Sequence, residues 1–423
     1  MLLPCKEKGW YDTNMKVEPR TLKGFRDFLP KEARKRAYVL NILKEVFESY
    51  GFEPLETPAL EYEDILSGKY GDEGDKLMYK FTDNGDRKVA MRYDQTVPLA
   101  RVAAQYANDL PLPFKRYQIQ NVYRAENTQK GRFREFLQVD IDTVGSTSLL
   151  ADAEIIAIAV KSFEKLGFKN FKAVINDRRI FQELIKNKLI DESSLILILR
   201  AIDKLGKIGE KGVLEELGKA GIDKNQRKLL LDTIKNFVPD KDFSNIFELL
   251  KDQGISENNF EFNPTLARGL DYYTGAIFEI VSDDYPTGSL GGGGRYDNLI
   301  GMFSNSPIPA VGFAFGFDRV IEAMTELNLF PADLEEAKVL VTNTSPDSSK
   351  IANELRSKGI KTELYVDEKD LDKQLKYADK KQIPFVLIAG QTLTLKNMKT
   401  GEKKEVILDV ILNSFQDPEI NSG

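Results

Sequence analysis

The sequence predicts an α+β fold in which an antiparallel sheet is flanked by helices, contains a helical insertion and is followed by a C-terminal α/β domain. Two stretches of alternating side chains, Lys115–Tyr123 and Phe133–Asp142, flank a polar loop and have the period-two pattern of a β-hairpin. Residues 178–258 are rich in Leu, Ile, Lys and Glu with little strand signal, which indicates helices. After Leu334, strand-like and helix-like segments alternate, as in an α/β domain.

These patterns also predict where the domains begin and end. A chain of 423 residues has room for roughly two to four domains. We expect an N-terminal lead over residues 1–18, a first domain over 19–327 that contains the insertion, and the α/β domain over 334–423. The stretch NLFPAD, residues 328–333, is the expected linker.

The composition is that of an ordinary soluble protein and excludes several kinds of site. Hydrophobic residues make up 42% and charged residues 30%, with a net charge of -6. A single cysteine rules out an intramolecular disulfide and a multi-cysteine zinc site, and it fits a reducing cytoplasm. No long apolar run is present, so we expect neither a signal peptide nor a membrane span.

The chain contains no histidine. A Ser-His-Asp triad, an imidazole base and a histidine-ligated metal are therefore impossible. Any chemistry must depend on carboxylates, arginines, lysines, tyrosines or oxygens of the substrate itself.

The predicted hairpin carries polar side chains where a core strand would be apolar. Alternation places one set of side chains of its second strand on a single face, namely Arg134, Phe136, Gln138, Asp140 and Asp142. Arg124 ends the first strand, and Glu126, Lys130 and Arg132 lie in the loop between the strands. Such a face is costly in a core and useful in a pocket. The alternative is an ordinary surface hairpin with a solvated charged face.

Two segments before the hairpin leave a structural and a functional interpretation open. Pro54 and Pro58 lie in an extended run, which predicts an edge strand that is either a dimer surface or plain surface. Pro98 is expected at the first position of a helix, with Asp94 and Thr96 just before it. Those two residues either cap the helix or contribute to binding.

Two later segments also fit a ligand site. Four consecutive glycines, residues 291–294, allow close backbone approach to a ligand, although a flexible turn would explain them equally well. A strand after Pro309 runs into a helix that begins near Asp318, so Arg319 projects from the helix start. An anion at this position would gain from both the guanidinium and the helix dipole.

Taken together, these stretches resemble the histidyl-tRNA synthetases, a family of class II aminoacyl-tRNA synthetases. GFEPLETPALE, the pair YRAE and GRFREFLQVDID, and PAVGFAFGFDR are similar to motifs 1, 2 and 3 of that class. RGLDYYTG and SLGGGGRYDNLIG are similar to the two signatures of the histidine-specific family, and LKYADKKQIPFVLIAG to its anticodon-binding domain. The resemblance covers nearly all of the chain after Thr21.

The resemblance implies a histidine–tRNA ligase that uses ATP and Mg²⁺, acts on L-histidine and tRNA(His), and forms a homodimer in the cytoplasm. It implies two catalytic arginines, Arg124 and Arg268, around the α-phosphate. Its ATP-binding residues would be Arg124, Glu126, Arg132, Phe136 and Arg319, with Glu126 also the candidate metal ligand. Phe136 and Arg319 would enclose the adenine ring.

The resemblance also implies a pocket for the amino acid. Its histidine-binding residues would be Asp94, Thr96, Arg124, Gln138, Asp142, Arg268, Tyr272 and Tyr273. A neutral imidazole offers one hydrogen-bond donor and one acceptor, which Asp142 and Tyr273 would satisfy. Many bacterial members of the family carry glutamate at the positions of Asp94 and Asp142, so this chain departs from their pattern.

Two non-catalytic alternatives share the same core. One is the paralogue that serves as regulatory subunit of ATP phosphoribosyltransferase, which usually lacks the anticodon domain and signature residues. The other is a tRNA-sensing binding module of the kind fused to a stress kinase. Signature residues such as Arg124, Tyr273 and Arg319, together with the C-terminal domain, favour the enzyme.

Overall fold

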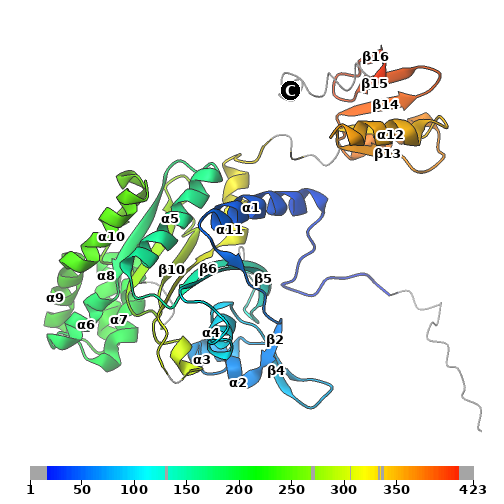
Figure 1. Ribbon diagram of the computed structural model, residues 1–423. Coiled ribbons are helices and arrows are strands. Elements are labelled where there is room, and N and C mark those ends of the chain that lie inside the picture. Colours follow the sequence, from blue (N-terminus) through cyan, green and yellow to red (C-terminus); the bar gives the residue numbers. More distant parts are fainter. Residues whose placement is uncertain are drawn as a thin grey trace, which may run out of the picture. The chain divides into compact units, whose positions relative to one another are not determined.

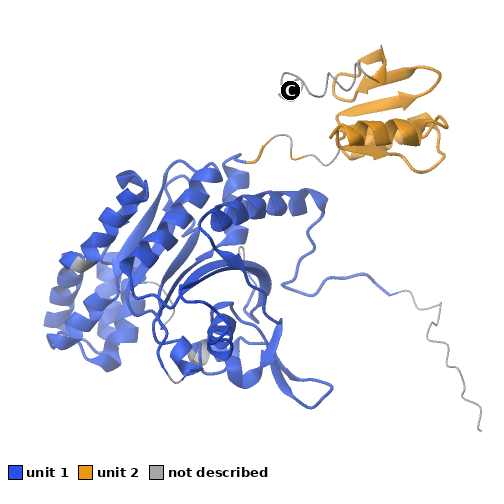
Figure 2. Ribbon diagram, in the orientation of Figure 1, with its two compact units in different colours: residues 1–329 blue, residues 330–423 orange. Residues whose placement is uncertain are grey.

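The computed structural model describes residues 17–128, 132–267, 272–304, 306–331, 334 and 338–408. The chain divides into two compact units, residues 1–329 and 330–423, shown in different colours in Figure 2. No helix in these described ranges is long and apolar enough to cross a membrane.

Unit 1 is built on an eight-stranded sheet. Across the sheet the strands are β1 (Glu53–Pro54), β5 (Phe114–Tyr123), β6 (Glu135–Val144), β11 (Ala310–Phe315), β10 (Gly291–Arg295), β9 (Ala276–Ser282), β7 (Phe171–Asp177) and β8 (Phe260–Phe262). The six central strands are antiparallel, whereas β1 and β8 pair in parallel at the two edges. The predicted fold class, an antiparallel sheet flanked by helices, is confirmed.

One face of the sheet is apolar and packs against helices α1 (Pro30–Ser49), α5 (Leu149–Lys165) and α11 (Phe317–Glu326) (Figure 1). Helix α5 begins where the Ser148 hydroxyl accepts a hydrogen bond from the backbone N–H of Leu150, and most of its side chains are buried. Phe315 of β11 meets Phe47 of α1 and Phe163 of α5, with ring centroids 5.5 and 5.8 Å apart. This packing leaves the other face of the sheet for polar residues.

A second layer covers part of that other face. It contains the small sheet β2 (Leu60–Tyr62), β4 (Lys88–Met91) and β3 (Lys80–Thr82), and helices α2 (Glu63–Leu66), α3 (Gly71–Lys76) and α4 (Thr96–Gln105). Its core joins Val97 and Ala100 of α4 to Phe114, Val144 and other residues at one end of the large sheet. Helix α4 begins at Thr96, so the prediction that Pro98 occupies the first helical position is wrong. The Asp94 carboxylate accepts from the N–H of Val97 at 3.1 Å and starts the helix earlier.

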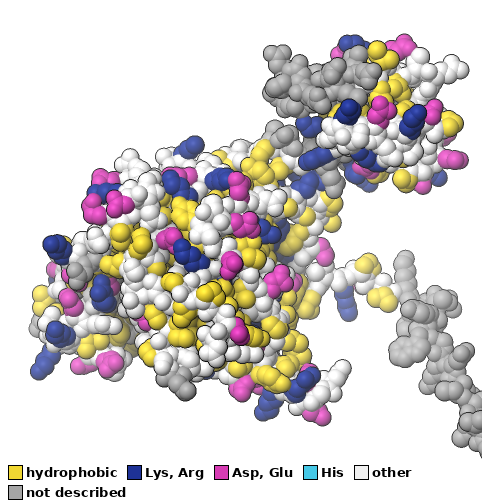
Figure 3. Space-filling view, in the orientation of Figure 1, with side chains coloured by type: hydrophobic (Ala, Val, Ile, Leu, Met, Phe, Trp, Pro, Cys, Tyr) yellow, Lys and Arg dark blue, Asp and Glu magenta, His cyan; other side chains and the backbone are white. Residues whose placement is uncertain are grey.

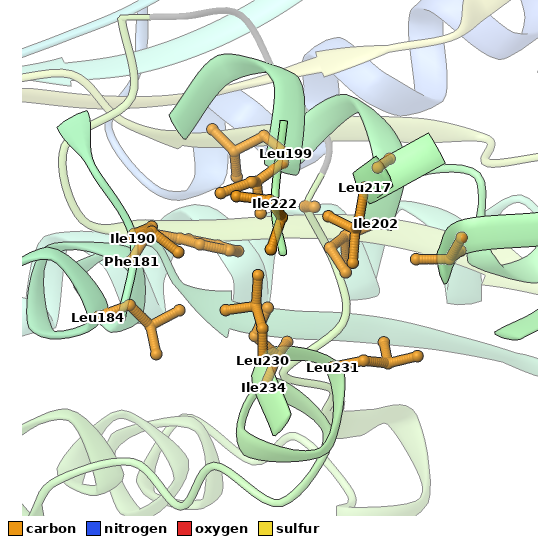
Figure 4. Close-up of a cluster of buried hydrophobic side chains, with 14 of the residues drawn as sticks. Phe181, Leu184, Ile190, Leu199, Ile202, Leu217, Ile222, Leu230, Leu231 and Ile234 are labelled. Carbon is orange, nitrogen blue, oxygen red and sulfur yellow. The ribbon is translucent and has the colours of Figure 1, made fainter. Parts of the chain in front are cut away.

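Five helices lie between β7 and β8 in the chain: α6 (Arg179–Lys186), α7 (Leu195–Ile202), α8 (Leu205–Lys219), α9 (Lys224–Lys235) and α10 (Lys241–Asp252). The first four enclose their own hydrophobic core, which includes Phe181, Ile202, Leu217 and Leu230 (Figure 4). Helix α10 packs against α5 and so ties this segment to the large sheet. Short 3₁₀ turns occur at Glu192–Ser194, Glu257–Asn259 and Ile300–Met302.

Unit 2 is an α/β domain with a five-stranded sheet. The strand order is β13 (Thr362–Leu364), β12 (Val339–Val341), β14 (Phe385–Ala389), β15 (Leu393–Asn397) and β16 (Lys403–Val406), with helices α12 (Ser348–Ser357) and α13 (Leu371–Lys380). The first three strands are parallel and the last two antiparallel. Apolar clusters centred on Leu355 and on Ala378 pack against β12 and β14. Residues 409–423 lie outside the described residues.

Candidate active site

The polar face of the large sheet is organised by the register of its strands. Directly paired residues of antiparallel strands share a face. One row across the sheet runs Arg116, Asp142, Gly312, Gly294 and Ile277, and the next runs Gln118, Asp140, Ala314, Gly292 and Glu279. Charged and amide side chains of β5 and β6 therefore lie beside a floor of glycine and alanine on β10 and β11.

The predicted hairpin face is buried rather than solvated. Gln138, Asp140 and Asp142 are only 8%, 3% and 3% exposed, so the alternative of an ordinary surface hairpin is wrong. The glycine run is likewise not a flexible turn, because it forms β10 in the interior of the sheet. Both observations place a polar, glycine-lined face in the core of unit 1.

Asp142 is held in place from two sides. Its Oδ1 atom accepts a hydrogen bond from the Tyr296 hydroxyl, and its Oδ2 atom lies 2.8 Å from Nη2 of Arg116. The carboxylate lies over the backbone of β11, where a Cβ atom on Gly312 would come within 1.9 Å of Oδ1. A glycine at position 312 is thus required for this placement of Asp142.

Asp140 is paired on one side only. Its Oδ2 accepts from Nε2 of Gln138 at 2.7 Å, while its buried Oδ1 has no hydrogen-bond partner among the described residues. Burial raises the pKa of Asp140 well above its ordinary value; Arg116 opposes the rise, and the charges of Asp142 and Asp94 add to it. Of the two carboxyls, Asp140 is the one that takes up a proton more readily.

Asp94 caps helix α4, which is the structural one of the two interpretations that the sequence left open. One oxygen, Oδ1, caps α4 and also accepts from the Tyr70 hydroxyl at 2.8 Å. The other oxygen, Oδ2, is buried and has no hydrogen-bond partner within the described ranges. A buried carboxylate oxygen left open in this way is a natural acceptor for a ligand N–H.

Tyrosines lie along one side of the polar face. The rings of Tyr272 and Tyr273 meet edge to face with centroids 5.0 Å apart, and Tyr272 makes the same kind of contact with Tyr296 at 5.8 Å. A Cβ atom on Gly294 would lie 3.0 Å from the Tyr273 ring, so this ring lies over β10. Burial raises the pKa values of Tyr272 and Tyr273, and nearby carboxylates add to the rise, so both hydroxyls stay protonated and can donate.

Arg124 stands at the end of β5 on the same face. Its Nε donates to the backbone carbonyl of Tyr93 at 3.1 Å. The guanidinium lies 4.5 Å from the ring centroid of Tyr93 and 5.1 Å from that of Phe136. These contacts fix the side chain while leaving other donors of its guanidinium for an anion.

Arg132 and Arg319 line a shared cavity of about 730 Å³. Arg319 donates through Nη1 to the carbonyl of Ser289, and Arg132 lies 3.6 Å from the carboxylate of Glu126. Phe25 and Phe133 also line this space. Two guanidiniums that are remote in sequence are thereby brought to one opening.

The comparisons with known proteins agree with this geometry. Residues 24–320 match the family model described as histidyl-tRNA synthetase. The chain belongs to the histidyl-tRNA synthetase family. Residues 337–417 match a second family model, that of an anticodon binding domain.

Individual relatives of the histidyl-tRNA synthetase family match over almost the full length. The histidine–tRNA ligase of Cytophaga hutchinsonii is 40% identical over 451 residues, covering 94% of this chain and 99% of the relative. That of Christiangramia forsetii is 38% identical, covering 93% and 98%. The crystal structure of histidyl-tRNA synthetase from Nostoc sp. PCC 7120 superposes with a TM-score of 0.82 at 31% identity, covering 95% of this chain and 99% of that one.

Not every residue that the family resemblance implies can be placed. Arg268 and Lys130 lie outside the described residues. Arg124 and the pair Arg132–Arg319 are described, but Arg124 does not line the cavity that the other two share. The sequence also predicts that the guanidiniums of Arg124, Arg268 and Arg319 meet over one triphosphate, and this stays a prediction because Arg268 lies outside the described residues.

The sequence analysis missed several residues of the polar face. Arg116, Gln118, Gln120, Tyr70 and Tyr296 all belong to it or contact it. The signal for the first three was present, because alternation counted back from Arg124 places them on that face. Tyr70 and Tyr296 come from distant segments, and only the tertiary fold brings them there.

Gly312 and Gly294 leave the space that the Asp142 carboxylate and the Tyr273 ring occupy. The buried Oδ2 of Asp94 and Oε1 of Gln138 have no hydrogen-bond partner among the described residues, so both can accept from a ligand. No group of three or more Asp, Glu or Cys side chains in the described ranges could hold a metal ion by itself.

Proposed function

We propose that this chain is a histidine–tRNA ligase, which activates L-histidine with ATP and transfers it to the 3' end of tRNA(His). In the first step a histidine carboxylate oxygen bonds to the α-phosphorus of ATP, and the bond to pyrophosphate breaks. In the second, a terminal ribose hydroxyl of the tRNA attacks the activated carbonyl and AMP leaves. The single observation that carries the proposal is the buried Asp142 carboxylate beside the protonated Tyr273 hydroxyl on a glycine floor.

The roles in the amino-acid pocket follow from hydrogen-bond chemistry. Asp142 accepts from one imidazole nitrogen and Tyr273 donates to the other, which excludes apolar look-alikes by leaving buried polar groups unpaired. Asp94, Thr96 and Gln138 receive the α-amino group, and Tyr272 closes the pocket. The open oxygens of Asp94 and Gln138 support this assignment.

The roles around the phosphates follow from charge. Arg124 binds the α-phosphate and the histidine carboxylate, and Arg268 approaches the same phosphate from the other side; both stabilise the charge of the transition state. Arg132 and Arg319 bind the outer phosphates, while Phe136 and Arg319 enclose adenine. Glu126 meets adenine or a Mg²⁺ ion that enters with ATP.

We assign tRNA(His) binding in part to unit 2, whose sequence matches an anticodon binding domain. Lys380 on α13 and Lys403 and Lys404 on β16 are exposed and could meet phosphates. On the face of the molecule drawn in Figure 3, basic and acidic side chains are interspersed over unit 1. Sequence-specific contact is therefore expected to depend on local patches and not on the net charge.

A homodimer in the cytoplasm completes the proposal. Strand β1 is an edge strand of the large sheet. Leu60, Tyr62 and Tyr106 are 43%, 56% and 44% exposed around a cavity of about 630 Å³ close to that segment in the chain. Exposed apolar side chains gathered in this way favour an interface. Sedimentation analysis at micromolar concentration should give twice the mass of one chain.

The deciding experiment is ATP–pyrophosphate exchange with each of the twenty amino acids. Exchange that depends on histidine alone supports the ligase, and silence with every amino acid would support a regulatory subunit or a tRNA-sensing module instead. Tyr273→Phe should raise the KM for histidine by roughly 10- to 100-fold, because a buried acceptor loses its donor. The matched control, Tyr365→Phe in unit 2, should leave exchange unchanged.

A further inference from the structure

Arg116 is a buried guanidinium that the implied reaction does not use. It lies on β5, its side chain is 0% exposed, and it pairs in register with Asp142 of β6. Its Nη2 atom is 2.8 Å from Oδ2 of Asp142, which makes an ion pair, but none of its three guanidinium nitrogens has a hydrogen-bond partner among the described residues. A fully buried arginine without a full set of partners is costly, so its position needs an explanation.

The charges around Arg116 supply that explanation. Asp140 and Asp142 are two residues apart on one strand and project to the same buried face. For both carboxylates, Arg116 is the leading charge that opposes the effect of burial. Asp94 adds a further negative charge near Asp140. In the part of the chain that the structure describes, the other groups near this cluster include the hydroxyls of Tyr70, Tyr272, Tyr273 and Tyr296 and the guanidiniums of Arg124 and Arg178.

We propose that Arg116 is a positioning residue for histidine recognition, which orients Asp142 and keeps it ionised as the imidazole acceptor without touching the substrate. This inference rests on the proposed function. Arg116 holds one carboxylate oxygen, Tyr296 holds the other, and Gly312 leaves the space in which the carboxylate lies. An ionised carboxylate has about four acceptor positions, so these two contacts leave room for an imidazole N–H.

Loss of the guanidinium should change the protonation of the pair. Two buried carboxylates without a nearby cation cannot both ionise at neutral pH, so a proton would be shared between Asp140 and Asp142. A protonated Asp142 would offer a donor where the imidazole N–H needs an acceptor. Raising the pH removes that proton, and histidine binding should then recover.

The test compares Arg116→Met and Arg116→Lys with Arg295→Met in the full-length chain. Arg295 is a matched control because it forms a buried ion pair with Asp152, away from the polar face. KM values for histidine and for ATP are measured by pyrophosphate exchange between pH 7 and pH 9, with folding checked by circular dichroism. The chain has no histidine of its own, so no enzyme imidazole titrates in this range.

For Arg116→Met we expect the KM for histidine to rise roughly 10- to 100-fold at pH 7, because a protonated Asp142 no longer accepts from the imidazole N–H, and to fall again toward pH 9. The KM for ATP should stay within about 3-fold of the parent, and Arg116→Lys should restore a flat profile because it keeps the positive charge. Arg295→Met should lose stability without any pH-dependent change in the KM for histidine.

Three results would overturn the inference. The first is a folded Arg116→Met chain with an unchanged KM for histidine, and the second is an equal rise in the KM for ATP. The third applies if Arg116→Met does not fold, and it uses the lysine variant. If Arg116→Lys has a KM for histidine as high as that of Asp142→Asn, the positive charge at position 116 is not what histidine binding requires. Absence of exchange in the parent chain would instead reject the proposed function itself.

Discussion

Asp140 and Asp142 lie two positions apart on β6 and have different partners. Asp142 is bound by Arg116 and Tyr296, whereas Asp140 receives a single hydrogen bond, from Gln138. Burial raises the pKa of Asp140 well above the 3.8 of an exposed carboxyl. The folded chain thus binds more protons at Asp140 than the unfolded chain. The free energy of unfolding therefore falls as the pH rises from the pKa of Asp140 in the unfolded chain to its pKa in the folded chain.

Asp140→Asn should therefore stabilise the protein at neutral pH, because the amide carries no charge for burial to penalise. The amide can still accept from Gln138. Thermal unfolding at pH 4 and pH 8 measures the effect, and the gain over the parent should be larger at pH 8. The KM for histidine should stay within about 3-fold of the parent, whereas Asp142→Asn should raise it roughly 10- to 100-fold.

Asp83 provides a control of opposite sign. It is partly exposed, and its hydrogen bonds with Arg87 lower its pKa. Its contribution to stability is present above the pKa of the unfolded chain and is lost as the pH falls through the folded value. Asp83→Asn should thus lower the melting temperature slightly at pH 7, and its difference from the parent should shrink as the pH falls. A lower melting temperature for Asp140→Asn at pH 8 would contradict the assignment of Asp140 as a carboxyl under electrostatic cost.

At the level of the strands, Gly312 on β11 is the position where a single methyl group should have the largest effect. A Cβ atom there would lie 1.9 Å from Oδ1 of Asp142, so the carboxylate would have to leave Tyr296 and Arg116. Gly312→Ala should cost about 1–3 kcal/mol of stability from overpacking. The KM for histidine in pyrophosphate exchange should rise far more than the KM for ATP. Measuring both KM values separates an effect on the histidine pocket from an effect on ATP binding.

Gly206→Ala is the matched substitution. Gly206 lies in helix α8, and a Cβ atom there would meet nothing within 4 Å. Alanine is the better helix former by about 1 kcal/mol, so this variant should be slightly more stable and fully active. Equal losses of activity in Gly206→Ala and Gly312→Ala would show that the effect at β11 is not local.

The same strands show which elements a sequence can reveal. The alternation of side-chain types along β5 and β6 is visible in the sequence. The predicted hairpin strands differ from the observed ones by two residues or fewer at each end. The strand β10 is four glycines and an arginine, so it carries no alternation, and a turn and a strand were equally compatible with it. The early start of α4 depended on a hydrogen bond from Asp94 that spacing alone did not reveal.

The site residues also divide into those that a local sequence pattern reveals and those that only the tertiary fold brings together. Gln138, Asp140 and Asp142 were found because they alternate along one strand. The pairing of Asp142 with Tyr296 joins residues that are 154 positions apart, and no local pattern contains it. The family resemblance supplied the candidate roles, while the burial and partners of each side chain came only from the fold.

For the whole molecule, the two compact units predict separable steps. Unit 1 contains the polar face and its own cores, and unit 2 has apolar clusters of its own. A chain that ends at Leu329 should keep histidine-dependent pyrophosphate exchange within about 3-fold. Its charging of tRNA(His) should fall by roughly 100-fold or more, since a linked second binding module typically contributes that much. Loss of exchange in a folded truncated chain would show that unit 2 is needed for activation.

The absence of histidine from all 423 residues gives the molecule an unusually simple pH dependence. Between pH 5.5 and 8 no imidazole of the protein titrates, so the group that changes charge first is the imidazole of the substrate, with a pKa of about 6.5. Its protonated form has two donors and no acceptor, and the Tyr273 hydroxyl, which burial keeps protonated, would then face a second donor. The KM for histidine should rise about 10-fold for each pH unit below 6.5 while kcat stays nearly flat.

A competitive histidine analogue whose ring pKa lies two units lower should bind without this rise. A wild-type kcat that titrates with a midpoint between 6 and 7 would instead place a titrating protein group in the chemistry, and with no histidine in the chain a buried carboxyl such as Asp140 would be the first candidate.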